Sequence, residues 1–346
     1  MVLAVILPEQ RILGFNPTEE TIFALARQYP SSKWIIFSQA QHSSIQLQLP
    51  NVSREPLPRN WNNLLVKSYW YTSTLGKLIK AYGITDFWST EAYRLKKSLV
   101  STAVLADEYF LNDRMLSLRR SMNKYDTPLV FSEAAFPEMI KQKFGNMSSY
   151  IILPQAPPVA SPASDSTEYD VPYFLCHTKG ASKPEVLQLL KAFSFFKRRM
   201  SSSTKLILLT EGIDQALLVD NFQNYKFRED VHFEPVPDKE KIFSLLHNCI
   251  AWISLTKSSI PFFSIHLAAQ ASKPVIASAD EHKAQIFGES LAYFDSQETL
   301  AAQMINMYKD ENLRSFYSEL SFSLTHQKII DFKDLSLAKL LAVKEL

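Results

Sequence analysis

Short continuous runs of hydrophobic residues alternate along the first half of the chain with longer segments that have helical spacing. Residues 2–7 are apolar throughout, as expected for a strand that is buried on both faces. Asn16, Pro17 and Glu19 predict a helix start, because asparagine caps helices and proline suits the first helical position. The same pattern predicts strands at 33–37, 86–89, 99–105, 129–132 and 150–153, and helices at 61–82 and 134–144.

The second half of the chain repeats this alternation. We expect strands at 173–176 and 205–209, and helices at 183–200 and near 215–222. Residues 231–295 follow in the order strand, helix, strand, irregular loop, helix, strand, loop, strand. Helices at 298–308, 311–324 and 335–344 complete the chain.

Alternating strands and helices predict an α/β fold with parallel sheets and right-handed crossovers. We expect two Rossmann-like domains, an N-terminal one at 1–154 and a C-terminal one at 173–332. The segment 155–172 is rich in Pro, Ser and Ala and predicts an interdomain linker; a long surface loop within one domain is the alternative. Two such domains form a cleft at the carboxyl ends of their strands, where these folds bind ligands.

Composition narrows the function classes. A chain of 346 residues suits two domains, and its net charge of +2 predicts no nucleic-acid partner. Cys176 and Cys249 lie in apolar runs, which indicates buried thiols in a reducing, cytoplasmic compartment. Residues 1–7 are too short for a signal peptide, and no apolar run approaches the length of a membrane span. Only seven glycines are present, which counts against a well-formed nucleotide-phosphate site.

Residues 231–295 resemble the donor-binding half of retaining glycosyltransferases with the glycosyltransferase-B fold, the family-four group in particular. Residues 173–199 are similar to the first strand, turn and helix of that donor domain. The resemblance implies two Rossmann-like domains facing across a cleft, with a terminal helix, 333–346, that can cross back to the N-terminal domain. It also implies metal-free transfer of a sugar, with retention, from a nucleotide-sugar to a saccharide or lipid-linked acceptor, as in polysaccharide biosynthesis.

The donor site of the family is only partly matched in this sequence. A glycine, an arginine and a lysine of the family hold the donor diphosphate, and the corresponding turn here supplies His177, Thr178, Lys179 and Lys183, without the arginine. The two lysines are donor-binding candidates, and solvated turn residues are the alternative.

The carboxylates that the family uses are substituted. Counting back from Lys273, its two glutamates fall on Ser259 and Leu267, and Gln285 stands where another glutamate is common. Ser259 and Gln285 remain donor-binding candidates, whereas leucine accepts no hydrogen bond from a ribose hydroxyl.

Three acids are candidates for the catalytic role. Asp280 and Glu281 follow an expected strand and are the nearest substitutes, although loop acids are commonly solvated. In the first domain Asp107 matches the aspartate of a His-Asp pair of the family, with Ala106 at the histidine position.

Two functions from different classes remain. The chain is either an active glycosyltransferase or a catalytically silent relative that serves as partner or scaffold of an active one; sugar or nucleotide binding without catalysis is a third reading. Phe262 and Phe263, where the family carries a polar loop, indicate a filled pocket or a protein contact. The histidines show no metal-ligand spacing, so no metal or cofactor is expected. We expect at most peripheral membrane contact, at the inner face of the membrane.

Overall fold

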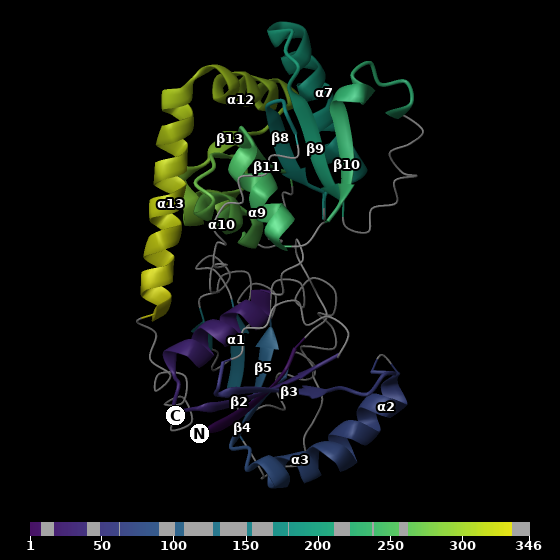
Figure 1. The fold of residues 1–346 in the computed structure, drawn as a ribbon, viewed down its shortest axis with the longest axis vertical. Coiled ribbons are helices and arrows are strands. Elements are labelled where there is room, and N and C mark those ends of the chain that lie inside the picture. The colour runs from purple at the N-terminus through teal and green to yellow at the C-terminus, as the bar shows by residue number, and fades with distance from the viewer. Residues whose placement is uncertain are drawn as a thin grey trace. The chain divides into compact units, whose positions relative to one another are not determined.

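The computed structural model describes residues 1–7, 17–39, 49–61, 63–89, 101–106, 127–131, 151–153, 169–178, 180–210, 222–236, 239–255 and 262–333. The chain divides into two compact units, one with the described residues up to 153 together with 331–333, and the other with the described residues of 169–330. Each unit contains one parallel sheet with helices on its faces (Figure 1). The predicted α/β class with two Rossmann-like domains is therefore confirmed.

The first unit is built on a sheet in the order β3-β2-β1-β4-β5-β6-β7 within the described residues. Alternate residues of its central strand point to opposite faces. Leu3 and Val5 pack with α1 on one face, and Ala4 and Ile6 pack with the α2–α3 segment on the other. The strands are β1 Val2–Ile6, β2 Lys33–Ser38, β3 Val52–Pro56, β4 Asp86–Ser89, β5 Ser101–Ala106, β6 Thr127–Phe131 and β7 Ile151–Leu153, and α1 is Pro17–Gln28.

The helix predicted over 61–82 is interrupted, which the sequence pattern did not indicate. It consists of α2 (Leu64–Tyr69), a π-helical turn η1 (Trp70–Thr74) and α3 (Leu75–Tyr82). The helix ends at Gly83 as expected, and Gly83 adopts a left-handed conformation with φ of 63°. The start predicted at 61 is wrong, because Asn63 caps α2 by accepting a hydrogen bond from the amide of Leu65 (2.9 Å).

Strand β3 was missed at the sequence level. Its residues, Val-Ser-Arg-Glu-Pro, form no apolar run, because β3 lies at the sheet edge and is only partly buried. The helices predicted at 134–144 and 335–344, and most of the one near 215–222, lie outside the described residues.

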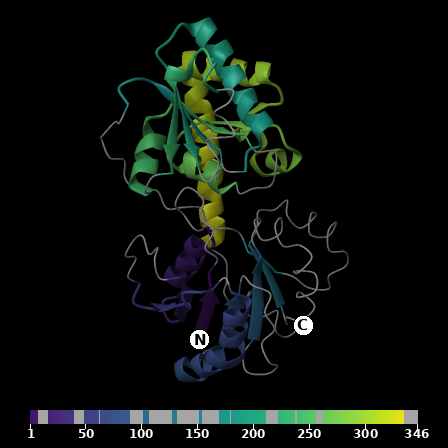
Figure 2. The ribbon, with the colours of Figure 1, turned by 90° about the vertical axis from the view of Figure 1, so that its right-hand side faces the viewer.

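The second unit is built on a sheet in the order β10-β9-β8-β11-β12-β13, again within the described residues. Its strands are β8 Tyr173–His177, β9 Lys205–Thr210, β10 Val231–Pro235, β11 Ala251–Ser254, β12 Val275–Ser278 and β13 Ala292–Phe294. Its helices are α7 Lys183–Met200, α9 Lys239–Asn248, α10 Phe263–Gln270, α11 Glu281–Phe287, α12 Gln297–Lys309 and α13 Glu311–Lys333. Helix α13 was predicted over 311–324 and runs nine residues further, as one long helix that lies along the side of the unit in Figure 1 and behind its other elements in Figure 2.

The interior of this unit includes a large apolar cluster. Helices α7 and α12 pack against each other over one face of the sheet, where Phe174, Phe193 and Phe196 join the central cluster.

The thiols of Cys176 and Cys249 are buried, as predicted, and burial raises the pKa of Cys249 to about 12. Both cysteines are therefore uncharged core residues at neutral pH.

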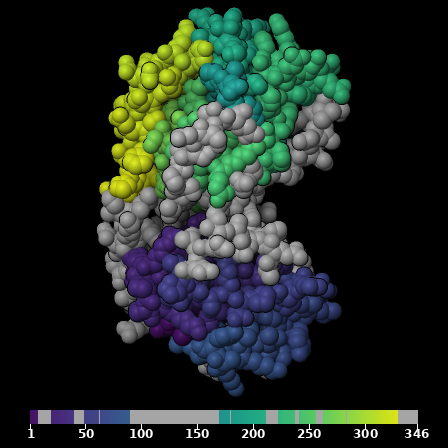
Figure 3. Space-filling view, viewed as in Figure 1, coloured from purple at the N-terminus to yellow at the C-terminus, as the bar shows by residue number. Residues whose placement is uncertain are grey.

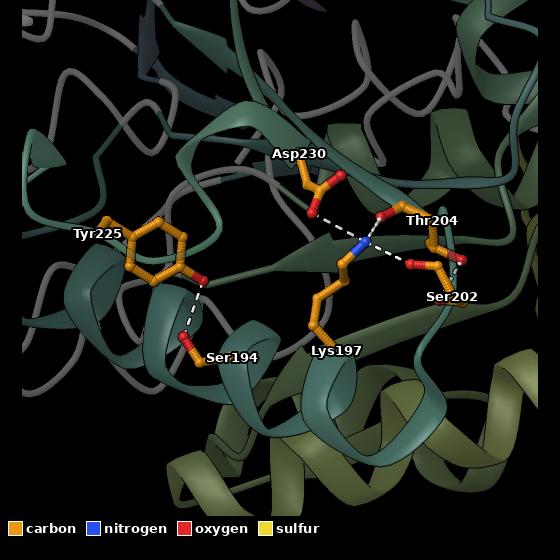
Figure 4. A network of polar contacts seen from close by, with 6 residues as sticks. All are labelled: Ser194, Lys197, Ser202, Thr204, Tyr225 and Asp230. Carbon is orange, nitrogen blue, oxygen red and sulfur yellow. Dashed lines mark hydrogen bonds and ion pairs between the residues drawn. The ribbon is translucent and has the colours of Figure 1, made fainter.

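The basic end of α7 contains a buried cation, Lys197. Lys197 is buried, and its ammonium group donates to the carbonyl oxygens of Ser202 and Thr204 and forms an ion pair with Asp230 at 2.9 Å (Figure 4). The chain reverses here through Ser201, whose φ is 48°. Lys197 therefore joins the end of α7 to the segment that precedes β10.

Candidate functional site

The strand order of the second sheet reverses between β8 and β11. Strands β9 and β10 lie on one side of this pair, and β12 and β13 lie on the other. The chain therefore continues from β8 toward one side of the sheet and from β11 toward the other. Open α/β sheets bind ligands at such a point, outside the carboxyl ends of the strands. His177 at the end of β8 pairs with Ser254 at the end of β11. We call the buried polar residues His177, Thr178, Ser254 and Ser278 the carboxyl edge.

In the turn from β8 to α7, the polar groups of Thr178 form hydrogen bonds within the protein. Thr178 donates from its backbone amide (3.0 Å) and from its hydroxyl (3.1 Å) to the carbonyl oxygen of Leu209, which ties the turn to β9. Gly180 has a positive φ of 75°, a conformation that favours glycine. Lys183 is exposed at the first position of α7, and Lys179 lies outside the described residues.

Glu185 takes part in capping the N-terminus of α7. Its carboxylate accepts hydrogen bonds from the backbone amide and the hydroxyl of Ser182, both at 2.7 Å. An anionic group therefore already occupies the helix N-terminus, where the family resemblance places a diphosphate. Sequence reasoning missed Glu185, although serine followed three residues later by glutamate before an apolar run is the signature of a capping box.

The segment from β12 to α11 brings a cation to the carboxyl edge. Lys283 is 1% exposed, and its ammonium group donates to the hydroxyl of Ser278 at 2.6 Å and to the carbonyl oxygen of the same residue at 3.3 Å. Burial lowers the pKa of Lys283 to about 8, against the charges of Asp280 and Glu185, which raise it. Lys283 was not singled out from the sequence, because a lysine next to a charged loop normally indicates a solvated surface.

Asp280 caps α11. Its carboxylate accepts from the amide of Lys283 at 3.2 Å, and its carbonyl oxygen accepts from the amide of Ala284. Asp280 is half-buried, whereas Glu281 and Gln285 are exposed on α11. Of these three sequence candidates, Asp280 alone contributes to the charge environment of Lys283.

The segment around α10 is apolar. Leu267 is fully buried, and Phe262 and Phe263 at the start of the same helix are buried as well. The ring of Phe262 contacts that of Phe287 edge-on with centroids 5.5 Å apart. His266 shares a hydrogen bond of 2.9 Å with the hydroxyl of Thr325 on α13. Helix α10 therefore packs inside the unit at the position where the family resemblance places a ribose-binding glutamate.

Several sequence candidates are not tested by this geometry. Ser259 and Asp107 lie outside the described residues, as does Lys179. In the part of the chain that the structure describes, no group of three or more His, Cys, Asp or Glu residues is placed to hold a metal ion. Among the described helices, none is both long and apolar enough to cross a membrane.

Comparison with known proteins supports the fold through structure alone. No protein-family model matches the sequence, and no curated protein matches it. A glycosyltransferase from Rickettsia africae superposes with a TM-score of 0.65 at 13% identity, over 99% of this chain and 97% of that one. A sucrose-phosphate synthase from Thermosynechococcus elongatus gives 0.69 at 12% identity, over 99% and 98%.

A third solved structure agrees with these two. WaaG, a glycosyltransferase involved in lipopolysaccharide biosynthesis, gives a TM-score of 0.64 at 11% identity over 96% of this chain and 98% of that one. The similarity thus extends over nearly the whole length of each protein, including both parallel sheets. The chain therefore has the glycosyltransferase-B fold, as the sequence resemblance predicted.

Proposed function

We propose that this protein is a glycosyltransferase that binds a nucleotide-sugar at the carboxyl edge of the second sheet. The observation that carries the proposal is Lys283, a buried cation at the strand ends beside the point where the strand order reverses. A donor diphosphate needs positive charge, and the arginine expected from the family resemblance is absent. Lys283, with Lys183 and Lys179 of the β8–α7 turn, supplies that charge in its place.

The reaction follows from the family resemblance. The sugar is transferred with retention to a saccharide or lipid-linked acceptor, and no metal is required. The described carboxylate that both caps the helix carrying Lys283 and raises the pKa of this lysine is Asp280. We assign to it the family's electrostatic role near the reacting sugar, with Asp107 on the acceptor side.

A second function is favoured by a different observation. Leu267, Phe262 and Phe263 are all buried in the apolar packing around α10, which leaves no acceptor for ribose hydroxyls at that position. A silent relative that serves as a scaffold or partner of an active glycosyltransferase accounts for this packing. Donor binding separates the two functions.

Titration calorimetry of the full chain against a panel of nucleoside diphosphates and nucleotide-sugars tests the proposal. We expect micromolar to submillimolar binding of one member, and a loss of about tenfold or more in Lys283→Met, since a hydrogen bond to a charged group contributes about 1.5 to 3 kcal/mol. Lys309→Met removes an exposed lysine of the same unit and is the matched control.

The pH dependence gives a second readout. Because burial lowers the pKa of Lys283 to about 8, the diphosphate affinity should fall as the pH rises through 8 and the ammonium loses its proton. Turnover of the bound nucleotide-sugar that disappears in Asp280→Asn would establish the enzyme. Absence of binding across the whole panel would reject the glycosyltransferase and leave the scaffold function.

A further inference from the structure

Helix α7 carries a basic surface on the side that faces away from the sheet. Phe193 and Phe196 of this helix pack into the core of the unit. The exposed side chains of its second half are spaced so that they share the outer face: Lys191, Phe195, Arg198 and Arg199. Figure 3 shows the teal atoms of residues 173–210 uncovered at the top of the second unit.

The segment that precedes β10 extends this surface. The hydroxyl of Tyr225 donates to the carbonyl oxygen of Leu190 at 2.8 Å and accepts from the hydroxyl of Ser194 at 2.9 Å, so the segment lies beside α7 (Figure 4). Two exposed cations follow Tyr225 along the chain. The name basic face is used below for the five cations and the one aromatic ring of these two segments: Lys191, Phe195, Arg198, Arg199, Lys226 and Arg228.

Acidic side chains of the same segments do not neutralise the basic face. The carboxylate of Asp230 forms an ion pair with the buried Lys197 at 2.9 Å, which leaves Glu229 as the exposed acid beside the basic face. Glu298 of α12 interacts electrostatically with Lys191. Among the described residues, no ion pair joins a cation of the basic face to a carboxylate. The charge of this surface is therefore available to a partner.

Contacts behind and within the basic face hold its side chains in place. The guanidinium group of Arg198 lies over the ring of Phe195, 4.7 Å from the centroid, and its Nε donates to the carbonyl oxygen of Ser194 at 3.3 Å. Lys197 secures the end of the same helix. Side chains that are ordered before binding lose less conformational entropy when a partner binds. Arginine and aromatic residues are also enriched in the energetically important parts of protein interfaces.

The basic face lies away from the candidate donor site. Helix α7 begins next to the carboxyl edge and ends at Met200, just before β9 starts at Lys205. Arg228 likewise precedes β10, which starts at Val231. The arginines of the basic face therefore lie near the amino ends of these strands, opposite the carboxyl edge. A partner bound there leaves the carboxyl edge open.

We propose that the basic face binds an acidic segment of a partner protein. Carboxylates of that segment pair with Arg198 and Arg199, whose guanidinium groups match carboxylates in bidentate geometry, and an apolar side chain contacts Phe195, which is 41% exposed. From Lys191 to Arg198 the basic face extends about 10 Å along the helix, which suits a short peptide segment. The net charge of +2 for the whole chain provides no extended positive surface for a polynucleotide. The proposal does not depend on donor binding.

Fluorescence anisotropy with the full chain tests the proposal. The probe is a fluorescein-labelled peptide of glutamates around a central phenylalanine, and a peptide with lysines in place of the glutamates is its control. We expect binding of the acidic peptide alone, weaker at high salt because ions screen exposed charges. Arg198→Gln with Arg199→Gln should weaken this binding about tenfold, at about threefold for each exposed charged contact.

Two further variants separate a specific site from general charge attraction. Lys77→Gln with Lys80→Gln removes two exposed positive charges from the first unit and should leave the affinity unchanged. Phe195→Ser keeps every charge of the basic face and should weaken binding about threefold, since the apolar contact is lost. Absence of peptide binding at low salt would overturn the proposal, as would an unchanged affinity in either the arginine or the phenylalanine variant. Tighter binding of a single-stranded oligonucleotide than of the peptide, lost in the arginine variant, would also overturn it, because the partner would then be a nucleic acid.

Discussion

Two buried lysines of the second unit place an ammonium group in very different surroundings. Lys197 forms an ion pair with Asp230 at 2.9 Å and donates to two carbonyl oxygens, so its ammonium group has three partners within the protein. Lys283 donates to Ser278 and is influenced by Asp280 and Glu185, yet burial still lowers its pKa to about 8. The first lysine is a structural link, and the second is the cation that we propose for donor binding.

The structural role of Lys197 predicts a large loss of stability on its removal. Lys197→Met leaves the carbonyl groups of Ser202 and Thr204 and the carboxylate of Asp230 without their cation, which should lower the free energy of unfolding by about 2–3 kcal/mol. Urea denaturation measures this difference. Arg199→Met in the same helical turn is exposed and should change it by less than about 0.5 kcal/mol. Similar losses in both variants would contradict the structural role.

The lowered pKa of Lys283 predicts that the free energy of unfolding depends on pH in the alkaline range. Its pKa is lower in the folded protein, about 8, than the ordinary value of 10.5, so the unfolded chain binds more protons between these two values. Stability attributable to this residue therefore rises as the pH increases from about 8 to 10.5, by a total on the order of 3 kcal/mol. Lys283→Met should lack this rise, which unfolding at several pH values detects. Parallel pH profiles for the two proteins would show that Lys283 is not held in this state.

At the scale of elements, the beginnings of α7 and α11 are each held by a carboxylate of the chain itself. Glu185 accepts two hydrogen bonds from Ser182, and Asp280 accepts from the amide of Lys283. Helix N-termini attract anions, and here the protein supplies them internally. This arrangement keeps two negative charges near the cation at the carboxyl edge.

The cap on α7 is testable by substitutions that separate its shape from its charge. Glu185→Ala removes the acceptor for both groups of Ser182 and should cost about 1 kcal/mol in the free energy of unfolding. Glu185→Gln keeps an acceptor at the same position and should cost less than half of that, because glutamine also completes capping boxes. Equal losses in the two variants, measured by thermal denaturation, would show that the charge rather than the hydrogen bonds stabilises the helix.

Helix α10 determines whether the missing family glutamate can be restored. Leu267 is fully buried in this helix, so Leu267→Glu places an unpaired carboxylate in apolar packing and should lower the free energy of unfolding by about 3–5 kcal/mol. Ser264→Glu, on a partly exposed position of the same helix, should cost less than about 1 kcal/mol. A stable Leu267→Glu protein that binds a nucleotide more tightly than the wild type would instead place this position within reach of the donor.

At the scale of the whole molecule, the two parallel sheets are separate and each has its own reversal of strand order. In the first unit this point lies between β1 and β4, and in the second between β8 and β11. The segments that follow β1 and β4 lie outside the described residues, so the second unit offers the better defined candidate site. Solved glycosyltransferases share the architecture at 11–13% identity, and the architecture alone does not fix the reaction.

Hydrogen exchange locates a bound nucleotide within this architecture. A nucleoside diphosphate at saturating concentration should slow exchange of backbone amides after β8, β11 and β12, where the carboxyl edge lies, by several-fold. The amides of β10 and β13 at the sheet edges should be unaffected. Protection confined to the first unit would move the nucleotide site away from Lys283.

The element order was readable from the chain because it depends on local patterns. Apolar runs, such as residues 33–37, predict buried strands directly, and Gly83 ends α3 as its position suggests. Edge strand β3 escaped because it is polar, and the π turn at Trp70–Thr74 escaped because no local signal distinguishes it from an α-helical turn. The regular core was therefore predictable, and the departures from regularity were not.

The two-domain α/β architecture, the buried cysteines and the absence of the family's carboxylates at Ser259 and Leu267 were readable from the order of residues alone. The tertiary structure settles which charged residues are buried, because burial depends on segments that are distant along the chain. It placed Lys283 against Ser278 at the carboxyl edge, paired Lys197 with Asp230, and left Leu64 and Leu65 exposed on a helix anchored from its other side. No local sequence feature distinguishes a buried lysine or leucine from an exposed one. The difference arises from the packing of elements that are distant along the chain.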